Sequence, residues 1–101
     1  MTPDTIGKRL ALARHFSGLT AARLGVIAGL SNGTVLMIEK GTRVDPSSGS
    51  IGKLALVLGV SADWLINGTG EEPDPATVLA SATAADEAAA HKPPSDPEAA
   101  E

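Results

Sequence analysis

The sequence predicts an all-α fold, a compact bundle of five short helices, from three features of its first 70 residues. Apolar residues recur at intervals of three and four, the spacing that places side chains on one face of a helix. Hydroxyl or acidic residues precede these segments and glycines follow them, as is typical of helix starts and ends. No segment alternates apolar and polar residues as a half-buried strand does.

The first expected helix starts at Thr2-Pro3-Asp4. Proline is tolerated at the first helical position, and an acidic side chain is favourable at the positive end of the helix dipole. Ile6, Leu10 and Ala13 then share one face, and Ser17-Gly18 ends the helix.

Four more helices follow, most of them with a capping residue, an inward apolar face and a terminal glycine. In the second helix these residues are Thr20, then Leu24, Ile27 and Ala28, then Gly29. In the third they are Ser31, then Val35 and Ile38, then Gly41. The fourth places Ile51, Leu54, Ala55 and Leu58 inward and ends at Gly59, and a short fifth helix is capped by Ser61 and holds Trp64 and Leu65.

The last third of the chain differs in composition, which divides the protein into residues 1–70 and an acidic tail, residues 71–101. The first part has seven Lys and Arg against four Asp and Glu, a net charge of +3, whereas the tail has one against eight, a net charge of −7. Rich in Ala and Pro and without aromatic residues, the tail is expected to be mostly disordered. The alternative is a helix capped by Asp74 with Pro75 in its first position.

Composition also argues against several classes of function. Without cysteine, the chain can form neither a disulfide framework nor a thiolate metal site. We find no carboxylate pair, catalytic triad or ligand cluster with usable spacing, and so expect no enzyme, no metal and no cofactor. The longest apolar run is too short to span a membrane, and the N-terminus does not resemble a signal peptide, so a cytoplasmic protein is expected.

The second and third helices are joined by only Gly29-Leu30-Ser31, which is the geometry of a helix-turn-helix. The surrounding LTAARLGVIAGLSNGTVLMIEKG, together with the later LGVSADWLINGTG, is similar to the pattern of the phage repressor and Cro-like family, also called the xenobiotic-response-element family. The resemblance covers residues 6–70. It implies a lambda-repressor-like helix-turn-helix domain that binds double-stranded DNA.

The resemblance also implies roles for individual residues. Arg14 and Glu39 match an ion pair between the first and third helices, a structural role. Thr20 and Ala21 match the start of the second helix, whose amides meet a phosphate. Ser31 matches the cap of the recognition helix, and Lys40 and Arg43 match the basic phosphate and minor-groove contacts after the third helix. The positions that face DNA in the third helix correspond to Asn32, Gly33, Thr34, Leu36 and Met37.

The sequence departs from the family pattern at the expected interface. Ala21 stands where glutamine is common, Gly25 where alanine is usual, and Ser48 where an apolar residue is usual. The outward face of the third helix holds Leu36 and Met37 rather than the polar side chains that read base edges by hydrogen bonding. Either these two residues contact thymine methyl groups, or the face binds a protein.

We therefore expect a sequence-specific DNA-binding transcriptional regulator. Its simplest form is a repressor that binds a two-fold-related operator as a homodimer, because one such module reads only a few base pairs. The alternative is a protein-interaction module on the same fold, of the antirepressor or antitoxin type, that uses the apolar face of the third helix against a protein partner.

Overall fold

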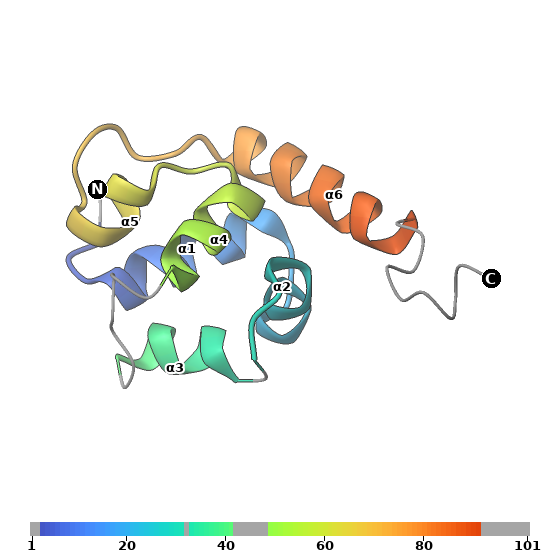
Figure 1. Cartoon of the computed structure of the whole chain (residues 1–101). Coiled ribbons are helices and arrows are strands. Elements are labelled where there is room, and N and C mark those ends of the chain that lie inside the picture. Colours follow the sequence, from blue (N-terminus) through green and yellow to red (C-terminus); the bar gives the residue numbers. More distant parts are fainter. Residues whose placement is uncertain (1–2, 32, 42–48, 92–101) are drawn as a thin grey trace.

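The computed structural model of the protein describes residues 3–31, 33–41 and 49–91. These ranges contain six helices and no strand, which confirms the all-α fold class (Figure 1). The helices are α1 (Ile6–Ser17), α2 (Ala21–Ala28), α3 (Thr34–Lys40), α4 (Ser50–Leu58), α5 (Ala62–Asn67) and α6 (Pro75–His91).

Side-chain hydroxyls cap three of these helices as local chemistry favours. The Oγ atoms of Thr5, Thr20 and Ser61 each accept a hydrogen bond from the backbone N–H three residues later. Helix α1 therefore begins at Ile6 rather than at the expected Thr2-Pro3-Asp4, because Thr5 satisfies the first-turn amides. Helices α1 to α5 all end at a glycine with a φ angle between 69° and 81°.

The core is built from the apolar faces of all six helices. Its fully buried large side chains are Trp64, Leu10, Leu24, Leu54, Leu58, Leu65 and Val78. The other expected inward residues of these helices are also buried: Ala13 of α1, Val35 and Ile38 of α3, and Ile51 and Ala55 of α4. Helical spacing in the sequence thus predicted most of the core.

Helix α6 differs from the disorder expected for the tail. Asp74 caps it by accepting a hydrogen bond from the Thr77 amide (3.1 Å), and its Val78 and Ala82 are completely buried. It packs mainly against α1 and α4, and the Ser81 hydroxyl donates to the Val57 carbonyl of α4 (3.2 Å). For residues 75–91 the structure has the alternative, a helix capped by Asp74, because composition describes a segment in isolation, whereas this helix buries its apolar stripe on a surface made by other helices. Residues 92–101 of the tail lie outside the described residues.

Close approach of α6 depends on Gly59, at the end of α4. A Cβ atom at this position would lie 2.6 Å from both Cβ and Oγ of Ser81, so any larger residue would push α6 away. None of the helices in the described ranges combines the length and hydropathy needed to cross a bilayer.

Candidate nucleic-acid interface

The turn between α2 and α3 has a well-defined backbone. At the end of α2, the Leu30 amide donates to the Gly25 carbonyl (2.9 Å) and the Gly29 amide donates to the Val26 carbonyl (3.1 Å). Two such bonds across a left-handed glycine satisfy carbonyls that the helix end leaves without partners. The turn therefore fixes the direction in which the chain leaves α2.

Helix α3 starts later than expected, and Ser31 does not cap it. The residue before the helix is Gly33, whose φ of 84° lies in the left-handed region that other residues rarely adopt. That conformation interrupts the helical backbone before Thr34, so no side-chain cap forms. Ser31 contributes its backbone carbonyl, which accepts from the Thr34 amide (3.1 Å), while its side chain is exposed. Asn32 lies outside the described residues.

The two faces of α3 are chemically distinct. Val35 and Ile38 are buried, and Thr34 is also buried, with 4% of its surface exposed. Thr34 therefore does not belong to the outward face on which it was expected, because its side chain lies one turn before Ile38 on the inward side. The outward face presents Leu36, which is 44% exposed, together with Gly33, Met37 and Lys40.

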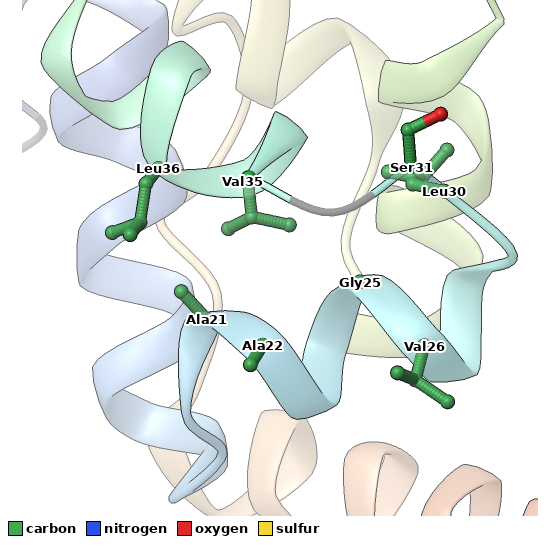
Figure 2. Close-up of a pocket in the computed structure, with 9 residues that line it drawn as sticks. Ala21, Ala22, Gly25, Val26, Leu30, Ser31, Val35 and Leu36 are labelled. Atoms are coloured by element: carbon green, nitrogen blue, oxygen red, sulfur yellow. The ribbon is translucent and has the colours of Figure 1, made fainter.

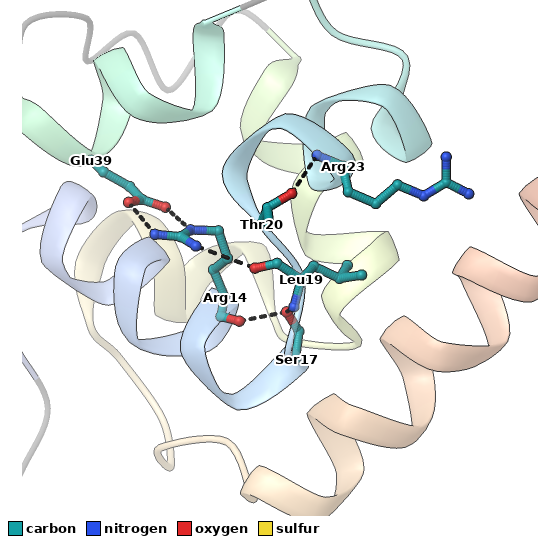
Figure 3. Close-up of polar contacts among 6 residues, drawn as sticks. All are labelled: Arg14, Ser17, Leu19, Thr20, Arg23 and Glu39. Carbon is teal, nitrogen blue, oxygen red and sulfur yellow. Dashed lines mark hydrogen bonds and ion pairs between the residues drawn. The ribbon is translucent and has the colours of Figure 1, made fainter.

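An ion pair ties the inward side of α3 to α1 (Figure 3). Arg14 donates through Nε to Oε2 of Glu39 (2.6 Å) and through Nη2 to Oε1 (3.0 Å). The hydrogen bond with Glu39 raises the pKa of Arg14, against the opposing effect of partial burial. Nη1 of Arg14 also donates to the Leu19 carbonyl (3.2 Å), which joins the turn between α1 and α2 to the same pair. These contacts hold α3 in a fixed orientation on the domain.

Two further residues that support α3 were missed at the sequence level. The Ser17 hydroxyl donates to the Arg14 carbonyl (2.5 Å) and accepts from the Leu19 amide (3.1 Å), which closes the turn before α2 (Figure 3). Gly7 lets α1 approach the last turn of α3, since a Cβ there would lie 2.5 Å from the Ile38 carbonyl oxygen. A glycine inside a helix is unfavourable and can mark a close approach, but neither Gly7 nor Ser17 reveals from sequence alone which segment it contacts.

Arg9, also missed, is a buried cation that holds α5. Its Nε and Nη2 donate to the carbonyls of Leu65 and Ile66 (2.9 and 2.8 Å), and its Nη1 donates to that of Pro3 (2.8 Å). A guanidinium at the carbonyl end of a helix is favoured by the helix dipole. Arg9 is therefore a structural residue and not a candidate for DNA contact.

The start of α2 lies beside the outward face of α3. Thr20 is exposed, and its hydroxyl caps the helix by accepting a hydrogen bond from the Arg23 amide, while Ala21 is half-buried. The side chain of Arg23 turns away towards α6, where its Nε bonds Oδ1 of Asp86 (2.6 Å). The first-turn amides of α2, rather than Arg23, are thus the groups that this helix offers to an anion.

An apolar groove of about 340 Å³ separates α2 from α3 (Figure 2). We call it the α2–α3 groove, and its lining residues are Ala21, Ala22, Gly25, Val26, Leu30, Ser31, Gly33, Val35 and Leu36. Small residues on α2 leave this space open: a Cβ on Gly25 would lie 3.7 Å from Cγ2 of Val35, an ordinary contact. Two departures from the family pattern, Ala21 and Gly25, therefore border the same groove.

Comparison with known families agrees with this geometry. A family described as "Helix-turn-helix domain" matches residues 7–71, which include α2, the turn and α3. The chain belongs to this helix-turn-helix family. None of the curated proteins and none of the solved structures compared with the chain matches it.

The helix-turn-helix domain thus accounts for α1 to α5, whereas α6 begins beyond the matched span, at Pro75. Lys40 is exposed at the end of α3, where a basic side chain can reach a DNA backbone. Its expected companion Arg43 lies outside the described residues, as does Ser48.

Proposed function

We propose that this helix-turn-helix protein is a sequence-specific DNA-binding transcriptional regulator, most simply a repressor that acts in the cytoplasm. The observation that carries the proposal is the contrast between the two sides of α3. One side is held by Val35, Ile38 and the ion pair from Arg14, while the other is exposed beside the start of α2. A firmly held helix with an exposed face is what insertion into a major groove requires.

Each part of the surface has a distinct role in this proposal. The α2 amides around Thr20 and Ala21, together with Lys40 and Arg43, bind phosphates and set the position of the domain. Asn32, Gly33, Leu36 and Met37 face the bases, with the two apolar side chains against thymine methyl groups. Ser31 acts through its backbone, which forms the turn. Thr34 also acts through its backbone, because its side chain is buried.

We further propose that the functional unit is a homodimer on a two-fold-related operator. A single recognition helix contacts only a few base pairs, so two copies are needed for useful specificity. We place the DNA-binding domain in residues 1–70 and treat the segment from residue 71, which includes α6, as an acidic extension packed on that domain.

A second function is favoured by the α2–α3 groove. Its lining is mainly apolar, and it lies between the exposed side chains of Val26 and Leu36. Such a groove also suits an apolar side chain of a protein partner, as an antirepressor or antitoxin would provide. In that case the outward face of α3 would serve protein binding in place of DNA.

Salt-dependent binding to duplex DNA separates the two functions. The full chain is titrated with a pool of random duplexes at several salt concentrations, and bound duplexes are amplified and sequenced. A DNA-binding regulator shows affinity that falls with salt and enriches a two-fold-related sequence. Absence of duplex binding at low salt would exclude this function in favour of the protein-binding alternative.

A further inference from the structure

Arg23, the only charged side chain of α2, is held by a residue that lies outside the helix-turn-helix match. Its Nε donates to Oδ1 of Asp86 (2.6 Å), which follows 63 residues later in the chain. Asp86 belongs to α6, a helix that begins beyond the span matched by the family. A charged contact therefore joins the first helix of the helix-turn-helix to a segment that the family model does not include.

Arg23 occupies the first turn of α2, at the end that this helix offers to an anion. Its own amide is used in the cap, since it donates to the Thr20 hydroxyl (3.0 Å). Long side chains of an α-helix lean towards the N-terminus of that helix. A guanidinium at this position can therefore reach an anion at the start of α2, where it adds a full positive charge to the partial charge of the amides.

In the structure, however, the guanidinium of Arg23 is turned the other way. Figure 3 shows the side chain extending from α2 on the side away from Glu39 of α3. There it meets the Asp86 carboxylate, and the two charges cancel. While this pair is formed, Arg23 cannot neutralise a phosphate beside the start of α2.

The pair of Arg23 with Asp86 is weak enough to open. The two side chains are 39% and 40% exposed, so water and salt screen their attraction. Helix α6 does not depend on the pair for its position, because Val78 and Ala82 are completely buried in the core. Arg23 can therefore leave Asp86 while α6 stays docked.

We propose that Arg23 is a phosphate-binding residue of the DNA interface, and that Asp86 of α6 competes with DNA for it. In the unbound protein the guanidinium pairs with the carboxylate, and on docking it exchanges this partner for a phosphate beside the start of α2. Asp86 thereby lowers the affinity for all duplexes alike, because the contact in competition is made to the DNA backbone and not to the bases. The inference rests on the proposed function, since it concerns the same interface.

The first test titrates the full chain and its variants with a random-sequence duplex at several salt concentrations. Asp86→Asn keeps the shape of the side chain but removes its charge, so it should tighten binding by about two- to fivefold, the strength of an exposed ion pair. Arg23→Ala should reduce the salt slope by about 1, as expected for one lost phosphate contact. Circular dichroism verifies that the variants stay folded.

The matched control is Glu87→Gln, which removes the same charge from an exposed neighbouring position of α6. It measures how much affinity rises merely because the protein becomes less acidic. The gain from Asp86→Asn should exceed this control, and it should fall to the level of the control when Arg23→Ala is also present. A gain no larger than the control, or one that persists without Arg23, overturns the proposal.

The second test follows the Nε–H resonance of Arg23 in the nitrogen-15-labelled chain, assigned by its loss in Arg23→Ala. Asp86→Asn should shift this resonance in the absence of DNA, because the hydrogen-bond acceptor has changed. Addition of the random-sequence duplex should shift the same resonance in the parent. A resonance that the bound duplex leaves unmoved overturns the exchange of partners.

Failure of this inference differs from failure of the proposed function. If neither the parent nor Asp86→Asn binds duplex at low salt, both are refuted. If the parent binds duplex but Asp86→Asn binds no more tightly than Glu87→Gln, the regulator stands and only the competition between Asp86 and DNA is refuted.

Discussion

Arg14 and Glu39 join α1 to α3 through two parallel hydrogen bonds, of 2.6 and 3.0 Å. The Glu39 carboxylate is the more buried partner, with 10% of its side chain exposed. Because α3 has only seven residues, its own hydrogen bonds cannot hold it in place. Its position therefore depends on this pair, on Val35 and Ile38, and on the close approach at Gly7.

Removing Arg14 should destabilise the fold more than removing an exposed charge. Arg14→Ala leaves the Glu39 carboxylate buried without its partner and should lower the free energy of unfolding by about 3 kcal/mol. The double change Arg14→Met and Glu39→Leu should recover part of this loss, because no buried charge remains. Urea denaturation of the parent and the two variants provides the measurement. Equal stability of all three proteins would show that the pair does not hold α3.

The pKa of Arg14 predicts how the pair responds to pH. Hydrogen bonding with Glu39 raises the pKa of Arg14 in the folded state. Its stabilising contribution is therefore complete below the pKa of the unfolded chain, and it is lost only as the pH rises through the higher folded value. Across neutral pH, ionisation of Arg14 should therefore not change the difference in the free energy of unfolding between the parent and Arg14→Ala.

Gly7→Ala should destabilise the protein although alanine is the better helix former. The new Cβ would lie 2.5 and 2.6 Å from the carbonyl oxygens of Ile38 and Glu39, so α1 and α3 must move apart. The matched control is Gly52→Ala in α4, where nothing lies within 4 Å and stability should rise by about 0.5–1 kcal/mol. Thermal melts compare the two. Equal gains at both sites would contradict the observed packing of α1 on α3.

Helix α6 should be held by its buried apolar residues more than by its ion pair. Val78→Ala removes methyl groups from a fully buried site and should cost on the order of 2 kcal/mol. Arg23→Ala breaks a half-exposed pair and should cost less than about 1 kcal/mol. Denaturant titrations give both values. If Arg23→Ala proved the more damaging change, α6 would be attached by charge and not by burial.

Lys40 should contribute to affinity without contributing to specificity. It is exposed at the end of α3, so Lys40→Ala should leave the fold intact. A lost phosphate contact should weaken binding to all duplexes alike and reduce the salt slope by about 1. Lys8→Ala, at an exposed site on α1 paired with Asp4, is the control expected to leave DNA binding unchanged. Selective loss of one duplex sequence would instead assign Lys40 to base recognition.

Local sequence signals predicted the helices and much of the core, because caps and apolar spacing act over a few residues. Thr20 and Ser61 cap their helices through their own side chains. Ser31 looked equivalent, but the left-handed backbone at Gly33 delays the helix, and this could not be read from the neighbouring residue types.

Contacts between distant segments were harder to predict. Arg9 bonds carbonyls more than 50 residues away, and Val78 is buried only because α1 and α4 offer it a surface. The ion pair of Arg14 with Glu39 came from the family resemblance and not from any local pattern. The candidate DNA surface therefore owes its position to nonlocal contacts that the sequence alone did not reveal.

The most direct measurement of the central proposal compares two duplexes, one selected from the random pool and one with its sequence scrambled. Both are titrated with the parent and with Leu36→Ala and Met37→Ala variants, alongside thermal melts. The parent should prefer the selected duplex, and each variant should lose preference by roughly 1–3 kcal/mol while scrambled-duplex affinity and melting temperature stay nearly constant. A parent that binds both duplexes equally, or variants that keep its full preference, would contradict recognition of bases by this face of α3.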